Sequence, residues 1–149
     1  MTLRKVISML LVITMLFAIC TSSVLASYVN IRNYSNTVDD YECIRSSKYN
    51  ETRVLANSIM TALDMTASVR MRALVAVDIV YTTGTIDASQ IIADAKTVNQ
   101  QGDTVNAYVS QDYDTTRLIS YFRCYHWYEV DGTTIDGGSY ESYYNGITG

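Results

Sequence analysis

The chain has 149 residues and carries 11 basic and 15 acidic residues, which gives a formal net charge of −4. This length allows one domain. The acidic balance argues against a nucleic-acid ligand, which needs a basic stripe to neutralise its phosphates, and against docking on anionic lipid.

Residues 1–26 have the layout of a secretory signal peptide. A short basic start at Arg4 and Lys5 precedes an apolar run from Val6 to Cys20, and the segment ends in Val24-Leu25-Ala26. The apolar run is shorter than the about 20 residues that a membrane-spanning helix needs, and an uncleaved anchor is the alternative. We therefore predict a helical signal peptide, export from a bacterial cell, and no stable membrane insertion after its removal.

Residues 27–50 are polar and show only short alternations, so an irregular N-terminal arm and an edge strand are both expected for them. Two cysteines remain after cleavage, Cys43 in this segment and Cys124 far along the chain. An even cysteine count in an exported protein predicts a disulfide between them. Two free buried thiols are the alternative.

A strict two-residue rhythm runs through residues 63–81. Every second side chain is apolar, in the order Leu63, Met65, Ala67, Val69, Met71, Ala73, Val75, Val77, Ile79 and Tyr81. Such alternation predicts a strand; a helix is the rival, because Ala, Met, Leu and Arg are good helix formers. Since strands usually run 3–10 residues, we expect a break or bulge near Arg70–Ala73.

Turn signals divide the rest of the chain. Residues 81–85 and 99–103 predict a turn and a loop, and Asp131-Gly132 is a strong hairpin signal. Residues 86–98 alternate in part, but Asp87 or Ser89 could also cap a short helix, so strand and helix both stay open there.

The segment 115–130 is the most aromatic part of the chain. Its alternation places Tyr121, Arg123, Tyr125 and Trp127 on one face of a strand. Aromatic faces stack on sugar rings, peptides or other aromatic groups, so these four residues are the candidate ligand-binding set. The alternative is that they face a second sheet and belong to the core.

Several strands separated by turns, with no proline and no long helix, predict an all-β fold, a small antiparallel β-sandwich. An immunoglobulin-like arrangement, with the two cysteines bridging the sheets, is one form of it by analogy. The expected organisation is a signal peptide at 1–26, an arm or edge strand at 27–50, the sandwich at 51–138 and a loose tail at 139–149.

Little in the sequence points to catalysis or to a metal. His126 is the single histidine, and the aspartates fall in expected turns, where Asp is favoured for backbone reasons. One histidine and two distant cysteines make no zinc set. The prediction is a protein without enzymatic activity, metal or cofactor.

The sequence-based hypothesis for function is a secreted binding module for a cell-wall glycan, another extracellular ligand or a surface protein. A bacteriocin-like toxin and a structural protein that self-associates through a strand edge are the alternatives.

Overall fold

The computed structural model describes residues 27–144, which form nine strands. The predicted signal-peptide helix at 1–26 lies outside the described residues. The strands are β1 (Val29–Val38), β2 (Tyr41–Tyr49), β3 (Arg53–Ala62), β4 (Val69–Tyr81), β5 (Ile86–Ala88), β6 (Ile92–Val98), β7 (Thr104–Asp112), β8 (Ile119–Val130) and β9 (Thr133–Tyr143). Between residues 27 and 144 no helix is long and apolar enough to cross a membrane.

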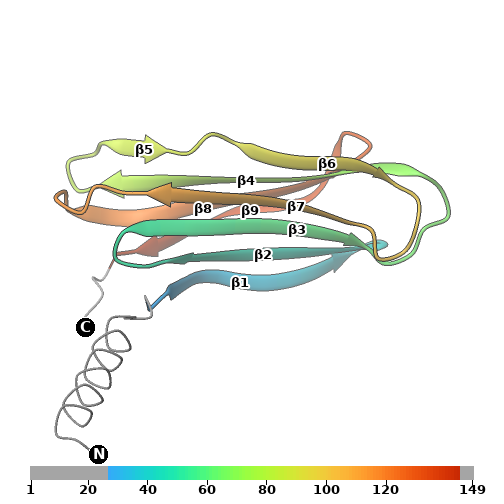
Figure 1. Ribbon diagram of the computed structural model, residues 1–149, viewed down its shortest axis with the longest axis horizontal. Coiled ribbons are helices and arrows are strands. Elements are labelled where there is room, and N and C mark those ends of the chain that lie inside the picture. The colour runs from blue at the N-terminus through green and yellow to red at the C-terminus, as the bar shows by residue number, and fades with distance from the viewer. Residues whose placement is uncertain (1–26, 145–149) are drawn as a thin grey trace, which may run out of the picture.

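Two antiparallel sheets pack face to face (Figure 1). The first sheet has the strand order β1-β2-β3-β7. The second has the order β5-β4-β8-β9, and β6 pairs with the same edge of β4 as β5. The predicted all-β antiparallel sandwich is therefore confirmed, and its core lies between the sheets, where both inner faces are removed from water.

The long two-residue rhythm forms one strand in its second part only. β4 begins at Val69, and its inner side chains from Met71 to Ile79 are fully buried. The break expected near Arg70–Ala73 is absent, because β4 keeps an unshifted register with β8 from Met71 to Val80. The chain instead leaves the first sheet after Ala62, and residues 63–68 cross to the second sheet as a connection without strand structure.

Residues 86–98 are strands rather than a helix. β5 and β6 both pair with β4, and the gap between them lies at Ser89. There the backbone N–H of Ser89 donates to the carbonyl of Val77 at 2.8 Å, and the N–H of Val77 donates to the Ser89 hydroxyl at 2.8 Å. The serine side chain thus takes a place in the ladder that a backbone group would fill, which explains why one edge is divided into two strands.

The sandwich extends beyond the expected domain limits at both ends. Residues 27–50 are not an irregular arm: β1 is an edge strand and β2 is an inner strand of the first sheet. At the other end β9 runs to Tyr143, so most of the expected tail belongs to the second sheet. The hairpin predicted at Asp131-Gly132 is present, and both residues adopt positive φ, at 48° and 80°.

Candidate functional site

The four aromatic-face residues named from the sequence lie on the outer face of the second sheet. Tyr121, Arg123, Tyr125 and Trp127 alternate along β8 with fully or almost fully buried residues, and each is half-buried. Across the sheet they pair with β4, where Trp127 lies opposite Leu74 and Tyr125 opposite Ala76. Although they lie on the outer face beside these rings, Leu74 and Ala76 are only 8% and 7% exposed. This aromatic face is therefore not part of the core between the sheets.

A closed set of polar contacts holds the aromatic face in place. The Arg123 guanidinium donates to the hydroxyl of Tyr121 at 2.9 Å and to the carboxylate of Glu141 at 2.7 Å. The Tyr125 hydroxyl donates to Asp78 at 2.7 Å, and the Tyr125 and Trp127 rings stack with centroids 5.5 Å apart. Because each charge here already has a partner within the protein, ligand binding at this face stays a prediction.

Replacing Gly137 with alanine should destabilise the protein by about 1–2 kcal/mol. A Cβ at this position would lie 2.9 Å from a Trp127 ring carbon and 3.0 Å from the His126 carbonyl oxygen, so the ring and the strand would have to shift. Urea unfolding measures the loss. Trp127 is the single tryptophan, so its fluorescence should change in the folded state. Ser139→Ala, on the same exposed side of β9, is the control, and an equal, negligible effect of both variants would contradict the close contact.

A second group of polar residues lies between the sheets, where β2 faces β9. Arg45 is 4% exposed, and its guanidinium forms an ion pair with Asp136 and donates a hydrogen bond to the Tyr140 hydroxyl. The Tyr128 hydroxyl, on the same side, donates to the Ile44 carbonyl at 2.5 Å. A guanidinium buried this deeply is compatible with a stable fold only when a carboxylate compensates its charge. The stability of this part of the core therefore depends on Asp136.

His126 is fully buried beside this cluster and is not placed for catalysis. Its Nδ1 lies 2.9 Å from the Ser58 hydroxyl, which donates its own proton to the Leu74 carbonyl at 2.8 Å. Nδ1 must therefore carry the imidazole proton and donate it to Ser58. Burial, and then the nearby positive charge of Arg45, lower the pKa of His126 to about 4, so the ring is neutral at neutral pH.

The predicted disulfide between Cys43 and Cys124 is wrong: both thiols are free and fully buried. Cys124 lies against Ser47, whereas Cys43 lies four positions earlier on the same strand β2, near Tyr128. Four residues of strand correspond to about 13 Å, and a disulfide needs Cα atoms within about 7 Å. Both cysteines do face the core from opposite sheets, but the register keeps them apart.

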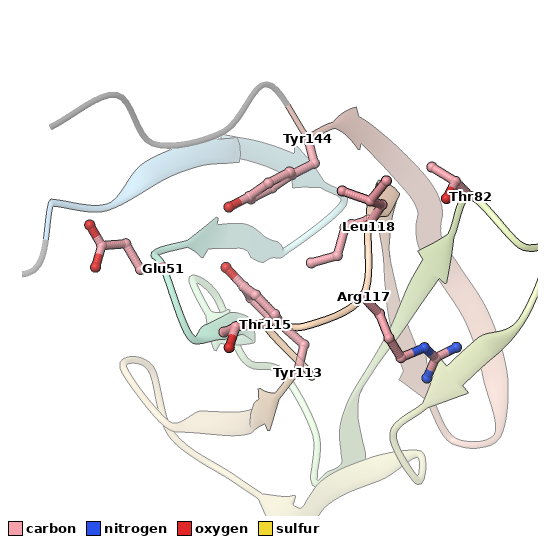
Figure 2. A pocket seen from close by; sticks show the side chains of 8 residues that line it. Glu51, Thr82, Tyr113, Thr115, Arg117, Leu118 and Tyr144 are labelled. Atoms are coloured by element: carbon pink, nitrogen blue, oxygen red, sulfur yellow. The ribbon is translucent and has the colours of Figure 1, made fainter.

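A pocket of about 420 Å³ lies at one end of the sandwich (Figure 2). It is lined by Glu51, Thr82, Tyr113, Thr115, Arg117, Leu118, Ile119 and Tyr144. These residues come from the β2–β3 turn, the β4–β5 turn, the β7–β8 connection with the start of β8, and the residue after β9. The floor belongs to a cluster of rings, in which Tyr113 and Tyr144 both contact Phe122. We call this feature the end pocket.

The charged groups of the end pocket are not equivalent. The Arg117 guanidinium lies 3.4 Å above the Tyr81 ring and 3.5 Å from the Asp87 carboxylate, so its charge is already partnered. Glu51 is exposed and forms no ion pair with any described residue. The charge left without a partner in the end pocket is therefore negative.

Sequence reasoning missed the end pocket because no local motif marks it. Glu51, Tyr113 and Tyr144 are separated by 62 and 31 positions and meet only once the turns gather at one end of the sandwich. The only signal was compositional, since the chain contains 13 tyrosines. The aromatic face on β8 could be found, because its residues are neighbours on one strand.

Comparisons with known proteins give little similarity. No protein-family model and no curated protein matches the chain. Among solved structures, the chain is similar to the alkylpurine DNA glycosylase AlkC of Pseudomonas fluorescens, bound to DNA containing an abasic site analog, with a TM-score of 0.34 and 20% identity. The similarity covers 60% of this chain and 25% of the glycosylase, and a TM-score this low carries no argument about activity.

Two expectations from the sequence are withdrawn, because none of the comparisons supports them. The structural match is a DNA-bound protein, and it agrees neither with the hypothesis of a secreted module for a glycan or surface protein nor with the exclusion of nucleic acid as a partner; at this TM-score it assigns no partner to the chain. The bacteriocin-like and self-associating alternatives belonged to the same hypothesis. Neither the glycan or surface-protein ligand nor these two alternatives are carried forward.

Proposed function

We propose that the protein binds a small organic amine or quaternary ammonium compound in the end pocket. The observation that carries this proposal is the Glu51 carboxylate, which has no cationic partner among the described residues and lies at a pocket walled by two tyrosine rings. A carboxylate supplies charge complementarity to an ammonium group, and tyrosine faces attract cations through their quadrupoles.

The two rings have a favourable arrangement for this purpose. The centroids of Tyr113 and Tyr144 are 6.4 Å apart and their planes meet at 76°, so they form two walls at nearly a right angle. Figure 2 shows their hydroxyl ends directed toward the side of the pocket where Glu51 lies. The Tyr113 hydroxyl donates to the Asn50 carbonyl, which fixes this ring. An ammonium group in the corner would meet both rings and the carboxylate.

The remaining walls favour a ligand that also has an apolar part. Leu118 is 77% exposed and lies across the pocket from Glu51 (Figure 2), and Ile119 also lines the pocket. A ligand that covered Leu118 would remove apolar surface from water at about 25 cal/mol per Å². The volume of about 420 Å³ lies in the range of small-molecule sites, which are concave and mostly apolar with few polar groups.

We further propose that the ligand is bound without being chemically converted. The groups that most often act as bases or nucleophiles are enclosed in the core: His126, Cys43 and Cys124 are all 0% exposed. Burial raises the pKa of both thiols to about 12, so they stay protonated and unreactive.

Export from a bacterial cell also stays a proposal. It is supported by the sequence of residues 1–26, with its basic start, apolar run and small residues at the end.

Isothermal titration with choline and tetramethylammonium tests the proposed function. We expect saturable binding of both cations, and Glu51→Gln should raise Kd by about tenfold, which corresponds to about 1.4 kcal/mol. Glu42→Gln is the control, because Glu42 is a partly buried carboxylate on β2, outside the pocket lining, that also has no ion-pair partner among the described residues. Equal binding of the neutral analogue 3,3-dimethylbutan-1-ol, or no saturable heat with either cation, would contradict the proposal.

A further inference from the structure

The open flank of the sandwich, where the edge strands β1 and β9 meet, contains two arginines and one paired carboxylate. Tyr34 is the cross-strand neighbour of Arg45, and Arg32 lies two residues before Tyr34 on the same face of β1. Both guanidinium groups reach the Tyr140 ring of β9. Among the ion pairs of residues 27–144, Arg45 has Asp136 and Arg32 has no carboxylate. The flank therefore holds one positive charge without a counter-charge, in a chain whose overall charge is negative.

Arg32 is held in place by aromatic rings rather than by an acid. Its guanidinium carbon lies 4.5 Å from the centroid of the Tyr34 ring and 4.7 Å from that of the Tyr140 ring. Its Nε is buried and has no hydrogen-bond acceptor among the described residues. A guanidinium fixed between two rings keeps its N–H groups oriented in one plane, where they can be shared with an incoming acceptor.

Arg45 lies against the same two rings. Its guanidinium carbon is 5.7 Å from both the Tyr34 and the Tyr140 centroid, and its Nε is also buried without an acceptor in the described part of the chain. The side chain as a whole is 4% exposed, so this unsatisfied donor is costly unless something else accepts its hydrogen. Asp136, Tyr140 and Arg32 are only partly buried, which leaves the flank open to solvent.

We propose that this flank is a binding site for a small oxyanion, a carboxylate, sulfate or phosphate group, held between Arg32 and Arg45. Arginine is suited to such a role because its planar donor set matches the oxygens of these groups. The anion would neutralise the unpaired charge and supply an acceptor to the buried N–H groups, and the tyrosines keep both cations in place while the site is empty. This site is independent of the end pocket and of the proposed function.

Thermal unfolding with added anions tests the site. Sodium sulfate, phosphate and acetate are added in turn at constant ionic strength, against a sodium chloride reference. We expect the midpoint to rise by about 3–5 °C when the preferred anion is about tenfold above its Kd. Titration calorimetry with the same three anions then gives Kd and identifies the chemical class.

Two variants of Arg32 and one control separate this site from general salt effects. Arg32→Gln should remove at least half of the midpoint shift, and Arg32→Lys should retain part of it, because charge is kept but the planar donors are lost. Arg70→Gln is the control, since Arg70 is an exposed arginine on β4 that also has no ion pair among the described residues. Arg45 is left intact because its replacement endangers folding. Equal shifts in the natural chain, Arg32→Gln and Arg70→Gln would overturn the proposal.

Discussion

Replacing Asp136 with alanine is expected to lower the free energy of unfolding by about 3 kcal/mol. The variant leaves the guanidinium of Arg45, 4% exposed, without the carboxylate that compensates its charge. A second cation, Arg32, shares the Tyr34 and Tyr140 rings with Arg45, so this cluster would hold two positive charges and no negative one. Urea unfolding followed by far-ultraviolet circular dichroism measures the loss.

Asp112→Ala is the matched control for this prediction. Asp112 is also paired with an arginine, Arg53, at 3.0 Å, but the two side chains are 72% and 45% exposed. Exposed ion pairs contribute about 0–1 kcal/mol, so this variant should be close to the natural chain. If both aspartate variants lost the same small amount of unfolding free energy, the ion pair between Arg45 and Asp136 would not be the strong contact that its burial indicates.

Stability should fall by about 3 kcal/mol as the pH decreases from about 6.5 to about 4, through His126 alone. In the unfolded chain the imidazole binds a proton below its ordinary pKa of 6.5, whereas in the folded chain burial and Arg45 lower the pKa to about 4. Between these values the unfolded state carries more protons, and acid therefore favours unfolding. The full stability is present above about pH 6.5 and decreases on the acidic side.

Urea unfolding at a series of pH values between 7 and 4 tests this dependence. The natural chain should lose up to about 1.4 kcal/mol per pH unit within this window. His126→Gln keeps a polar side chain that can contact Ser58 but cannot titrate, so its profile should be nearly flat down to about pH 5. Parallel profiles of the two proteins would show that His126 does not titrate differently in the folded and unfolded states.

The parts of the fold that could be predicted from the sequence are those set by neighbours along one strand. The alternation at 69–81 and the Asp131-Gly132 turn each depend on local spacing, and the strand and hairpin are present. β2 was harder to recognise because two of its inward positions are Arg45 and Ser47, which break the apolar pattern. Arg45 is buried with partners from β9 and Ser47 lies against Cys124 of β8, and no pattern within β2 reveals either contact.

Long-range register decided the features that sequence reasoning did not predict. Cys43 and Cys124 face the same core, and only the offset between the sheets shows that they lie too far apart to bond. The apolar rhythm at 63–68 continues into a connection, since those residues cross between sheets at the end of the sandwich. The end pocket joins residues from separate turns. That Glu51 has no cationic partner there is evident only from the structure, in which Arg117, the arginine of the pocket, pairs with Asp87 instead.

The measurement that tests the proposed function most directly is a map of amide chemical-shift changes, recorded by NMR while choline is added to the protein. The account predicts saturable changes around Glu51, Tyr113 and Tyr144, and none around Tyr125 and Trp127 on the outer face of the second sheet. Changes confined to that aromatic face, or no saturable change at either place, would contradict the assignment of the end pocket as the ligand site.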